Sequence, residues 1–477
     1  MKENAYMSIK KAAVVSAGSK YAIVVLQLIY TAILSRILTP EDFGTVAVVN
    51  VFIIFFQLIA DMGFGTGIIQ NKDLEKDDVK NIFSFTVYIG FLLMFIFICF
   101  SFLIAFFYND DEYISLCIVL SLALAFNSFN VVPNAVILKE KKFIDIAIRS
   151  IIVAIVSFTC TIFFALKGLG VYALVLYSVL NAVGVFVWNE AKTKIGFKFK
   201  PNIESLKKIW GYSMFQFGAQ TLNYFNRNLD NLLIGKFFSK AELGYYNKSY
   251  TLMQYPINYL PGAITPVLHP ILSEYQNNKQ VIYQKYMQVI RLLSLIGCFC
   301  AAFCFFSSRE IILIAFGDQW EASILPFKIL CLSLWPQIIT NTIAPIYQSI
   351  GYTKLMFKSL CITTTMIIGF IVCGIFSQSI VTVSIFVTIA YVINFFITFY
   401  ILIVKGFKLK YNGFIGTFRI EMFIFIILIL ESLIISINIE NVFISFGLKL
   451  LIMLATYVVL LLVTKQYKFF TSFIRKR

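Results

Sequence analysis

The segment Leu34-Ser-Arg-Ile-Leu-Thr-Pro-Glu-Asp-Phe-Gly44 separates two long apolar runs, and its pattern occurs twice in the chain. The segment Ile234-Gly-Lys-Phe-Phe-Ser-Lys-Ala-Glu-Leu-Gly244 repeats it 200 positions later. Each segment carries a cation, a hydroxyl, an acid and a glycine at the same spacing: Arg36, Thr39, Asp42 and Gly44 in the first, Lys236, Ser239, Glu242 and Gly244 in the second. In both, we expect a long helix to end, a short turn to follow, and a new helix to start after the acidic residue.

A second match, in the same order, indicates that the repeat extends along the chain. Pro133-Asn-Ala-Val-Ile-Leu-Lys-Glu-Lys-Lys-Phe143 resembles Pro345-Ile-Tyr-Gln-Ser-Ile-Gly-Tyr-Thr-Lys-Leu355, at an offset of 212. The alternative is generic similarity between hydrophobic helices. The repeat predicts a six-helix bundle over 1–200, a second over 201–410, and a C-terminal helix pair with a basic tail over 411–477. Transporters built from such repeats bind substrate between the halves.

The composition excludes a water-soluble fold. Hydrophobic residues make up 60% of the chain and charged residues 13%, against roughly 45–50% and about 25% in soluble domains. Apolar runs of spanning length predict an all-α polytopic membrane protein with about fourteen transmembrane helices. We expect them at 8–35, 43–66, 81–107, 113–138, 150–166, 170–190, 209–235, 244–272, 290–308, 320–350, 359–377, 381–404, 420–437 and 442–463.

The basic residues are distributed unequally between the two sides of the membrane. Of the forty Lys and Arg residues, thirty fall on the side that holds the N-terminus and five on the other. This positive-inside bias predicts that both termini are cytoplasmic. The net charge of +16 then faces anionic lipid headgroups rather than nucleic acid, and we expect the tail 465–477 to lie on that surface. The first apolar run, 12–38, is too long for a signal-peptide core and is expected to be retained.

Nothing in the sequence predicts a metal or cofactor site. All nine cysteines lie in apolar runs, and no histidine accompanies the nearest approach to a cluster, Cys298, Cys300 and Cys304. We expect small buried hydrophobic side chains there, without a disulfide framework. A phosphate-binding glycine loop of the Walker type is also missing from the sequence.

Three segments together resemble a known family: Leu34–Gly44, Asp61-Met-Gly-Phe-Gly65, and Asn228-Leu-Asp-Asn-Leu-Leu-Ile-Gly235 running into Leu243-Gly-Tyr-Tyr-Asn247. They are similar to the polysaccharide transporter family, the Wzx-type and teichuronic-acid-type flippases. The superfamily also contains multidrug and toxin extrusion (MATE) transporters and the lipid II flippase. The resemblance covers most of the chain and implies a MATE-like V-shaped fold with inward and outward states.

The resemblance also implies a function. The chain would be a flippase and not an enzyme, moving an undecaprenyl-diphosphate-linked oligosaccharide from the cytoplasmic to the outer leaflet by alternating access, for surface polysaccharide export. Its implied location is the bacterial cytoplasmic (inner) membrane. Membrane lipids and polysaccharide assembly proteins are the further partners, with no nucleic acid and no cofactor.

Charged residues within spans are functional candidates because a charge at the bilayer centre costs about 2.5–3.5 kcal/mol on insertion scales. Arg227 and Asp230 lie three positions apart on one helical face, in a stretch that also contains Gln220 and Asn223. The functional interpretation is that Arg227 binds a diphosphate oxygen with its planar guanidinium while Asp230 orients it or takes a proton. The alternative is a structural ion pair near the outer interface.

Three lysines within spans are weaker candidates. Lys20 offers a second cation to the same cavity, although its stem can also reach the cytoplasmic edge. Lys248 is either a cation at the outer mouth or an interfacial anchor. Lys328 is the weakest of the three.

Helix bends are the candidate gating elements. The glycines of Asp61–Gly65 predict a bend after Asp61, where a capping or gate role is expected. Interior prolines bend helices and free carbonyls, which lipid does not satisfy. The helices rich in proline should therefore line the moving pathway, unless the kinks only improve packing; they contain Pro256, Pro261, Pro266 and Pro270, and Pro326, Pro336 and Pro345. The single histidine, His269, is either a proton relay or an interfacial residue.

Two other functions compete. A cation-coupled drug antiporter of the same fold should have acids and few cations in its cavity, whereas this chain places Lys20, Arg227 and Lys248 within spans. A membrane glycosyltransferase or polymerase needs carboxylates over an acceptor, and Tyr108-Asn-Asp-Asp-Glu-Tyr113 offers them. The short outer connections leave no room for a loop that would bind donor and acceptor, and an acidic helix cap is the simpler interpretation.

Overall fold

The computed structural model describes residues 2–262, 272, 275, 278–435, 437 and 439–469, and their side chains from residue 18 onward except 210–216, 219, 222, 223 and 226. These residues form helices, turns and connections, and no strand occurs among them. The predicted all-α fold is therefore confirmed. The chain divides into two compact units, Met1–Gly244 and Tyr245–Arg477.

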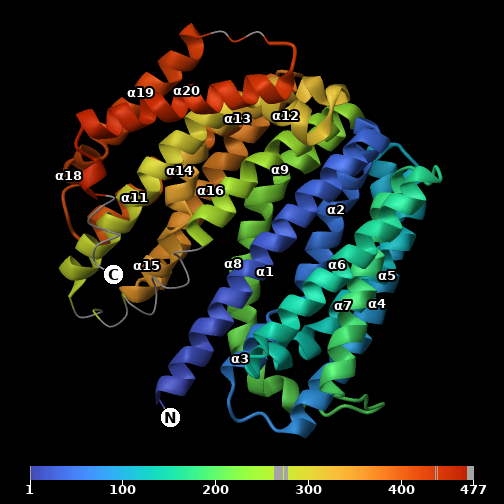
Figure 1. Cartoon of the computed structure of the whole chain (residues 1–477). Helices are drawn as coiled ribbons and strands as arrows, with labels where there is room; N and C mark the ends of the chain where they lie inside the picture. The colour runs from blue at the N-terminus through green and yellow to red at the C-terminus, as the bar shows by residue number, and fades with distance from the viewer. Residues whose placement is uncertain are drawn as a thin grey trace. The chain divides into compact units, whose positions relative to one another are not determined.

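The first unit consists of long helices connected by short turns (Figure 1). They are α1 (Lys2–Ile37), α2 (Pro40–Asp61), α3 (Phe64–Gln70), α4 (Lys76–Tyr108), α5 (Glu112–Lys139), α6 (Phe143–Leu166), α7 (Val171–Thr193), α8 (Glu204–Phe237) and the start of α9 (Lys240–Gly262). Helix α5 packs against α4 and α7, α1 packs against α6, and α8 packs against α2, α3 and α4. The repeat would assign α8 to the second half, and the boundary after residue 200 remains a prediction.

The second unit contains shorter and more broken elements. They are α11 (Lys279–Phe306), α12 (Ser308–Phe316), η1 (Asp318–Ser323), α13 (Ile324–Cys331), α14 (Leu334–Thr340), α15 (Ile343–Ser349), α16 (Thr353–Ile375), α17 (Ile380–Tyr400), η2 (Ile401–Gly406), α18 (Tyr411–Thr417), α19 (Arg419–Ile434) and α20 (Val442–Val463). Helix α11 packs against α14 and α19, and α16 against α17.

Ten helices in the described part of the chain are long and apolar enough to cross a membrane, or up to twelve if each of two bent pairs is one span. Helices α8 and α9 are not among them because they carry many polar residues, although they have 34 and 23 residues. The count of fourteen remains a prediction. Helix α4 exposes a row of large apolar side chains, since Phe91, Leu92, Phe95 and Phe106 are 57–82% exposed. Such a face is stable only in an apolar solvent.

The two repeated turns have the same local structure. Thr39 hydroxyl accepts the backbone N–H of Asp42 at 3.2 Å, and the Asp42 carboxylate accepts the Thr39 N–H at 2.9 Å. Ser239 and Glu242 make the same reciprocal bonds, at 3.2 and 3.0 Å. Each pair satisfies two amides that a helix N-terminus leaves without partners, so the sequence repeat is also a structural repeat.

The span predicted over 320–350 is bent, as its prolines indicated, but it is not one continuous helix. The structure breaks it into η1, α13, α14 and α15, and the two parts on either side of Leu332–Ser333 are bent by 57°. Pro326, Pro336 and Pro345 each lie in the first turn of one of these short helices. Proline is tolerated there because first-turn amides need no intrahelical partner, whereas inside a continuous helix it would remove a bond.

Buried charges hold the C-terminal helix pair to the rest of the second unit. Lys449 of α20 lies 2.7 Å from Glu310 of α12, with side chains only 10% and 2% exposed. Ser445 donates to the same carboxylate oxygen at 2.8 Å. Arg291 of α11 lies 3.5 Å from Glu421 of α19. Removing one partner of such a pair would leave an unpaired charge in an apolar region, so these contacts fix which helices pack together.

Candidate functional site

The repeat relates the predicted polar residues of α1 to those of α8. At the offset of 200 positions, Lys20 corresponds to Gln220, Gln27 to Arg227, and Leu34 to Ile234. Residues seven apart lie on one face of a helix, so each of these two helices carries two polar side chains and one apolar side chain along a single stripe.

The exposure of that stripe changes along both helices in the same way. Leu34 and Ile234, next to the repeated turns, are 0% exposed. Farther from the turns, Lys20, Gln27 and Arg227 are exposed and Gln220 is half-buried. Each stripe is thus packed at the end with the turn and open where its polar residues lie. An arginine or lysine held in that position can meet a ligand without first breaking a packed contact.

Other α8 side chains bond to α2 or within α8 itself. The Tyr224 hydroxyl donates to the carbonyl of Val51 on α2, and Asn228 donates to the Tyr224 carbonyl at 2.9 Å. Asp230 is only 2% exposed and accepts the N–H of Asn231 at 2.8 Å. Asp230 therefore lies in packed structure, whereas Arg227 is exposed, and the two differ in environment more than their spacing predicts.

The remaining binding candidates lie in different places. Lys248 on α9 is 5% exposed, and its ammonium lies 4.9 Å from the centre of the Phe316 ring and 5.2 Å from that of Trp320. Lys328 on α13 lies 4.6 Å from the ring centre of Phe305. The side chain of Asn223 lies outside the described residues, as do Pro266, Pro270 and His269.

The predicted gating residues coincide with changes in helix geometry. Helix α2 ends at Asp61, and the next two residues, Met62 and Gly63, have positive φ angles of 40° and 73° before α3 starts. The interruption lies at the predicted glycine-rich bend. Pro256 and Pro261 both lie inside α9. Their part in gating remains a proposal.

The acidic connection between α4 and α5 binds a lysine. Lys240 forms ion pairs with Asp110 and with Glu112, the latter at 2.9 Å. Burial by itself would raise the pKa of Asp110, but the hydrogen bond and charge of Lys240 outweigh it and leave that pKa below its ordinary value. Burial would lower the pKa of Lys240, but the two carboxylates raise it. These acids are occupied in an ion-pair cluster, which differs from the free carboxylates that a glycosyltransferase would need.

Sequence reasoning missed a buried arginine, Arg149 on α6. Arg149 is only 8% exposed. Its Nη1 donates to the side-chain oxygen of Asn134 on α5 at 3.1 Å and to that of Asn189 on α7 at 2.7 Å. Asn189 in turn donates to Asn130 at 2.7 Å. Arg149 lies close to the predicted start of its helix, where the charge pattern assigns it to a connection. The three asparagines near helix ends were the only signal in the sequence.

Among the residues that the structure describes, no group of three His, Cys, Asp or Glu side chains could hold a metal ion. The nine cysteines are all free thiols. The chemistry available at the α1 and α8 stripes is thus electrostatic, with cations and amides that suit an anionic group.

Comparison with known proteins agrees with this membrane architecture. A family model described as "Polysaccharide biosynthesis protein" matches residues 33–325. The teichuronic acid biosynthesis protein TuaB of Bacillus subtilis (strain 168) is 22% identical over 341 residues, 71% of each chain. The lipopolysaccharide biosynthesis protein WzxC of Escherichia coli (strain K12) is 24% identical over 400 residues, 81% of this chain and 79% of the relative.

Two solved structures share the fold. The lipid II flippase MurJ in an inward closed conformation matches with a TM-score of 0.75 at 13% identity. The match covers 95% of this chain and 99% of the MurJ chain. A multidrug resistance MATE family transporter in an inward-facing conformation has a TM-score of 0.64 at 16% identity, covering 81% and 96%. The family model spans more than half of the present chain, so this multi-pass membrane protein belongs to the family of polysaccharide biosynthesis proteins.

Proposed function

We propose that the protein flips an undecaprenyl-diphosphate-linked oligosaccharide from the cytoplasmic to the outer leaflet, by alternating access and without a chemical step. Three observations support the proposal. The chain belongs to a polysaccharide biosynthesis family, it shares the fold of a lipid II flippase over 95% of its length, and two related helices present exposed polar stripes. The stripes carry the argument, because a lipid-linked sugar needs a polar path for its head while its tail stays in lipid.

The diphosphate is the part of this substrate that most needs the protein. Its charges resist transfer through hydrocarbon, where an unpaired ion costs several kcal/mol. Arg227 on α8 is exposed within a helix of spanning length and can offer two parallel N–H bonds to phosphate oxygens. Lys20, on the related stripe of α1, supplies a second cation. Gln220 and Asn223 would bind the sugar hydroxyls, Asp230 would support α8 from its packed side, and Lys248 would act farther along the path.

We assign gating to the break after Asp61 and to the prolines of α9, Pro256 and Pro261, because a helix changes direction most readily at such positions. Pro266, which lies outside the described residues, is proposed to act with them. We infer that these positions reorient when the path opens to the other side of the membrane.

Thirty Lys and Arg residues are predicted at the helix ends on the side of the N-terminus, against five on the other side. These lysine-rich helix ends support a cytoplasmic membrane location with both termini inside, by the positive-inside rule. Proteins that build the sugar and that polymerise it would be the neighbours of such a flippase, since its substrate comes from one and its product goes to the other.

The test is transport in vesicles. We expect the purified full chain, reconstituted with an undecaprenyl-diphosphate-linked oligosaccharide, to expose the sugar to an external glycosidase or lectin with time. Arg227→Ala should reduce the initial rate at least tenfold and Arg227→Lys less, because lysine keeps the charge but not the paired donors. The matched control is Arg309→Ala, which removes an exposed arginine from the other unit.

Equal rates in Arg227→Ala and the wild type would remove this residue from the mechanism. The fold match to a MATE transporter makes a cation-coupled small-molecule antiporter the second candidate. Efflux of ethidium against a sodium or proton gradient, with no movement of any lipid-linked sugar, would replace the flippase proposal by that one.

A further inference from the structure

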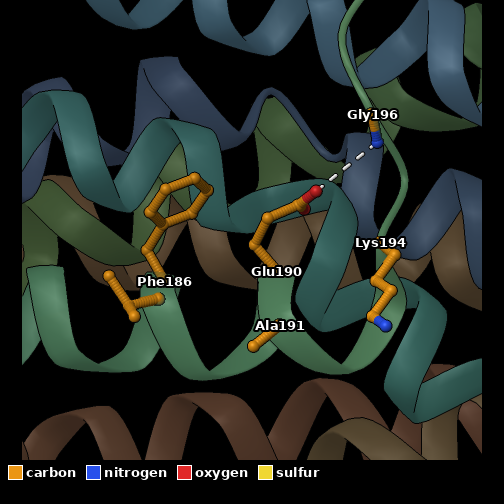
Figure 2. Close-up of a pocket in the computed structure, with 6 residues that line it drawn as sticks. Phe186, Glu190, Ala191, Lys194 and Gly196 are labelled. Atoms are coloured by element: carbon orange, nitrogen blue, oxygen red, sulfur yellow. Dashed lines mark hydrogen bonds between the residues drawn. The ribbon is translucent and has the colours of Figure 1, made fainter.

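A pocket lies at the end of α7, away from the polar stripes of α1 and α8. Its volume is about 430 Å³, and it is lined by Phe186, Val187, Glu190, Ala191, Lys194 and Gly196. Figure 2 shows Phe186, Glu190 and Ala191 on α7, and Lys194 and Gly196 at its end and in the chain that follows it. The walls are mostly apolar, with one lysine and one acid.

The acid in the pocket is engaged with the backbone. One Glu190 carboxylate oxygen accepts the N–H of Gly196 at 3.4 Å, shown as a dashed line in Figure 2, and the other is buried without a hydrogen-bond partner among the described residues. Gly196 has a φ of +76°, which a residue without a side chain adopts without strain. Glu190 therefore ties the turn at the pocket rim to α7.

Two lysines, Lys194 and Lys80, lie near the pocket rim. In Figure 2 the Lys194 side chain ends on the side turned away from the Glu190 carboxylate. A Cβ placed on Gly196 would lie 3.6 Å from the ammonium of Lys80, at the start of α4. The neighbouring lysines Lys192 and Lys198 are paired with acids on α6 and α4 at 3.3 and 2.5 Å, whereas no ion pair involves Lys80 or Lys194 within the described ranges.

Exposed apolar side chains occur in the pocket wall and in the chain that follows it. Val187 is 56% exposed and Phe199 is 84% exposed. Phe197 stacks edge-on against Phe199, with ring centres 5.2 Å apart. The Tyr88 hydroxyl holds the Phe199 carbonyl at 2.8 Å, which ties the connection to α4 next to its exposed apolar face. Aromatic rings interleaved with lysines at a helix end are typical of the layer where lipid headgroups meet hydrocarbon.

We propose that this pocket binds an anionic phospholipid of the leaflet that the lysine-rich helix ends face. The phosphate lies between the ammonium groups of Lys80 and Lys194, and the start of an acyl chain packs on Phe186, Val187 and Ala191. The charge is complementary, since Lys194 lines the pocket, Lys80 approaches its rim at Gly196, and neither lysine forms an ion pair in the described part of the chain. A soluble phosphate ester satisfies the lysines but leaves the apolar wall and the exposed Phe199 in water. The pocket is thus a lipid site distinct from the proposed path of the transported sugar.

The test is native mass spectrometry of the full chain, delipidated in detergent and titrated with dioleoyl-phosphatidylglycerol. We expect the first bound lipid to be held roughly tenfold more weakly by the double variant Lys80→Gln with Lys194→Gln, since each lysine near a lipid surface contributes to the attraction of an anionic headgroup. The matched control, Lys200→Gln with Lys207→Gln, removes the same charge from the same surface outside the pocket and should leave that first lipid in place.

A second variant separates the pocket from the charge. Ala191→Trp fills the apolar wall, keeps both lysines and lies at an exposed position, so it should fold normally and still lose the first lipid. Dioleoyl-phosphatidylcholine should bind no more tightly to the wild type than to either variant, and millimolar glycerol 3-phosphate should not displace the bound lipid. Three results would each overturn the proposal. They are an equal loss of affinity for the first lipid in the Lys80/Lys194 and Lys200/Lys207 double variants, unchanged binding in Ala191→Trp, and displacement of the lipid by glycerol 3-phosphate.

Discussion

Gly44 of α2 and Gly244 of α9 lie against each other where the two repeated turns meet. A Cβ at Gly44 would come within 1.8 Å of the Lys240 carbonyl oxygen and 3.2 Å of the Gly244 nitrogen. A Cβ at Gly244 would come within 2.1 Å of the Pro40 carbonyl oxygen and 3.4 Å of the Gly44 nitrogen. The contact is reciprocal, and both obstacles are backbone atoms. The glycines that define the sequence repeat are therefore the residues that let its two copies touch.

Gly44→Ala and Gly244→Ala should each destabilise the structure, because no real Cβ fits at these distances and only backbone movement can make room. The expected cost is about 1–3 kcal/mol, as for other overpacked sites. Thermal unfolding in detergent, followed by tryptophan fluorescence or a thiol-reactive dye, measures it.

The control for these variants is Gly369→Ala in α16, where nothing lies within 4 Å of the added Cβ. Alanine should leave that helix as stable or slightly more so, since it loses less backbone freedom than glycine on folding. A Gly44→Ala protein as stable as Gly369→Ala would show that the two turns do not touch in this way.

The Lys449–Glu310 pair should behave as a coupled unit. Lys449→Met leaves the Glu310 carboxylate buried without its cation, and Glu310→Gln leaves the lysine without its acid, so each should cost roughly 3–5 kcal/mol. The double variant should cost much less than the sum, because it leaves no unpaired charge. A double-mutant cycle from unfolding free energies measures the coupling, and additive single effects would argue against a direct pair.

Arg149→Ala should loosen the packing of α5, α6 and α7 on one another. The change leaves the side-chain oxygens of the buried Asn189 and the half-buried Asn134 without their donor, at about 1–3 kcal/mol for the buried group. Hydrogen exchange should rise at the ends of these three helices and not in α16 or α17. The exposed Arg309→Ala is the matched control; the same loss of stability in both variants would contradict a specific role for the asparagine cluster.

The fold was predictable from the sequence where local chemistry decides the structure. The hydroxyl and acid at Thr39 and Asp42, repeated at Ser239 and Glu242, are the residues that cap two helices. The glycines after Asp61 also lie where a helix is interrupted. In both cases, the residue types act on backbone atoms within a few positions, so a short segment contains the whole cause.

The features that could not be predicted depend on contacts between distant segments. The charge of Arg149 is visible in the sequence, but its burial requires Asn134 and Asn189 on two other helices. Lys449 was expected within a span, but its partner Glu310 is 139 positions away. Prolines predicted bends in 320–350, yet the angle of 57° between its two parts could not be read from their positions. Side-chain exposure on the α1 and α8 stripes could not be read from the sequence for the same reason.

The ion-pair cluster of Lys240 with Asp110 and Glu112 should add stability over a wide and defined pH range. The pKa of Asp110 is lowered in the folded protein, so its contribution is present above the ordinary aspartate pKa of about 4 and is lost as the pH falls through the lower folded value. The pKa of Lys240 is raised, so its contribution is present below the ordinary lysine pKa of about 10.4 and is lost as the pH rises through the higher folded value. Between about pH 5 and 9 both contributions are complete.

The difference in melting temperature between the wild type and Lys240→Met should therefore be constant in that range and shrink below about pH 4. Lys167→Met, which removes an exposed lysine of another connection, should show no such pH dependence. A wild-type advantage that persists unchanged to pH 2.5 would mean that the lysine acts through packing on Tyr113, 5.5 Å from its ring centre, and not through the two carboxylates.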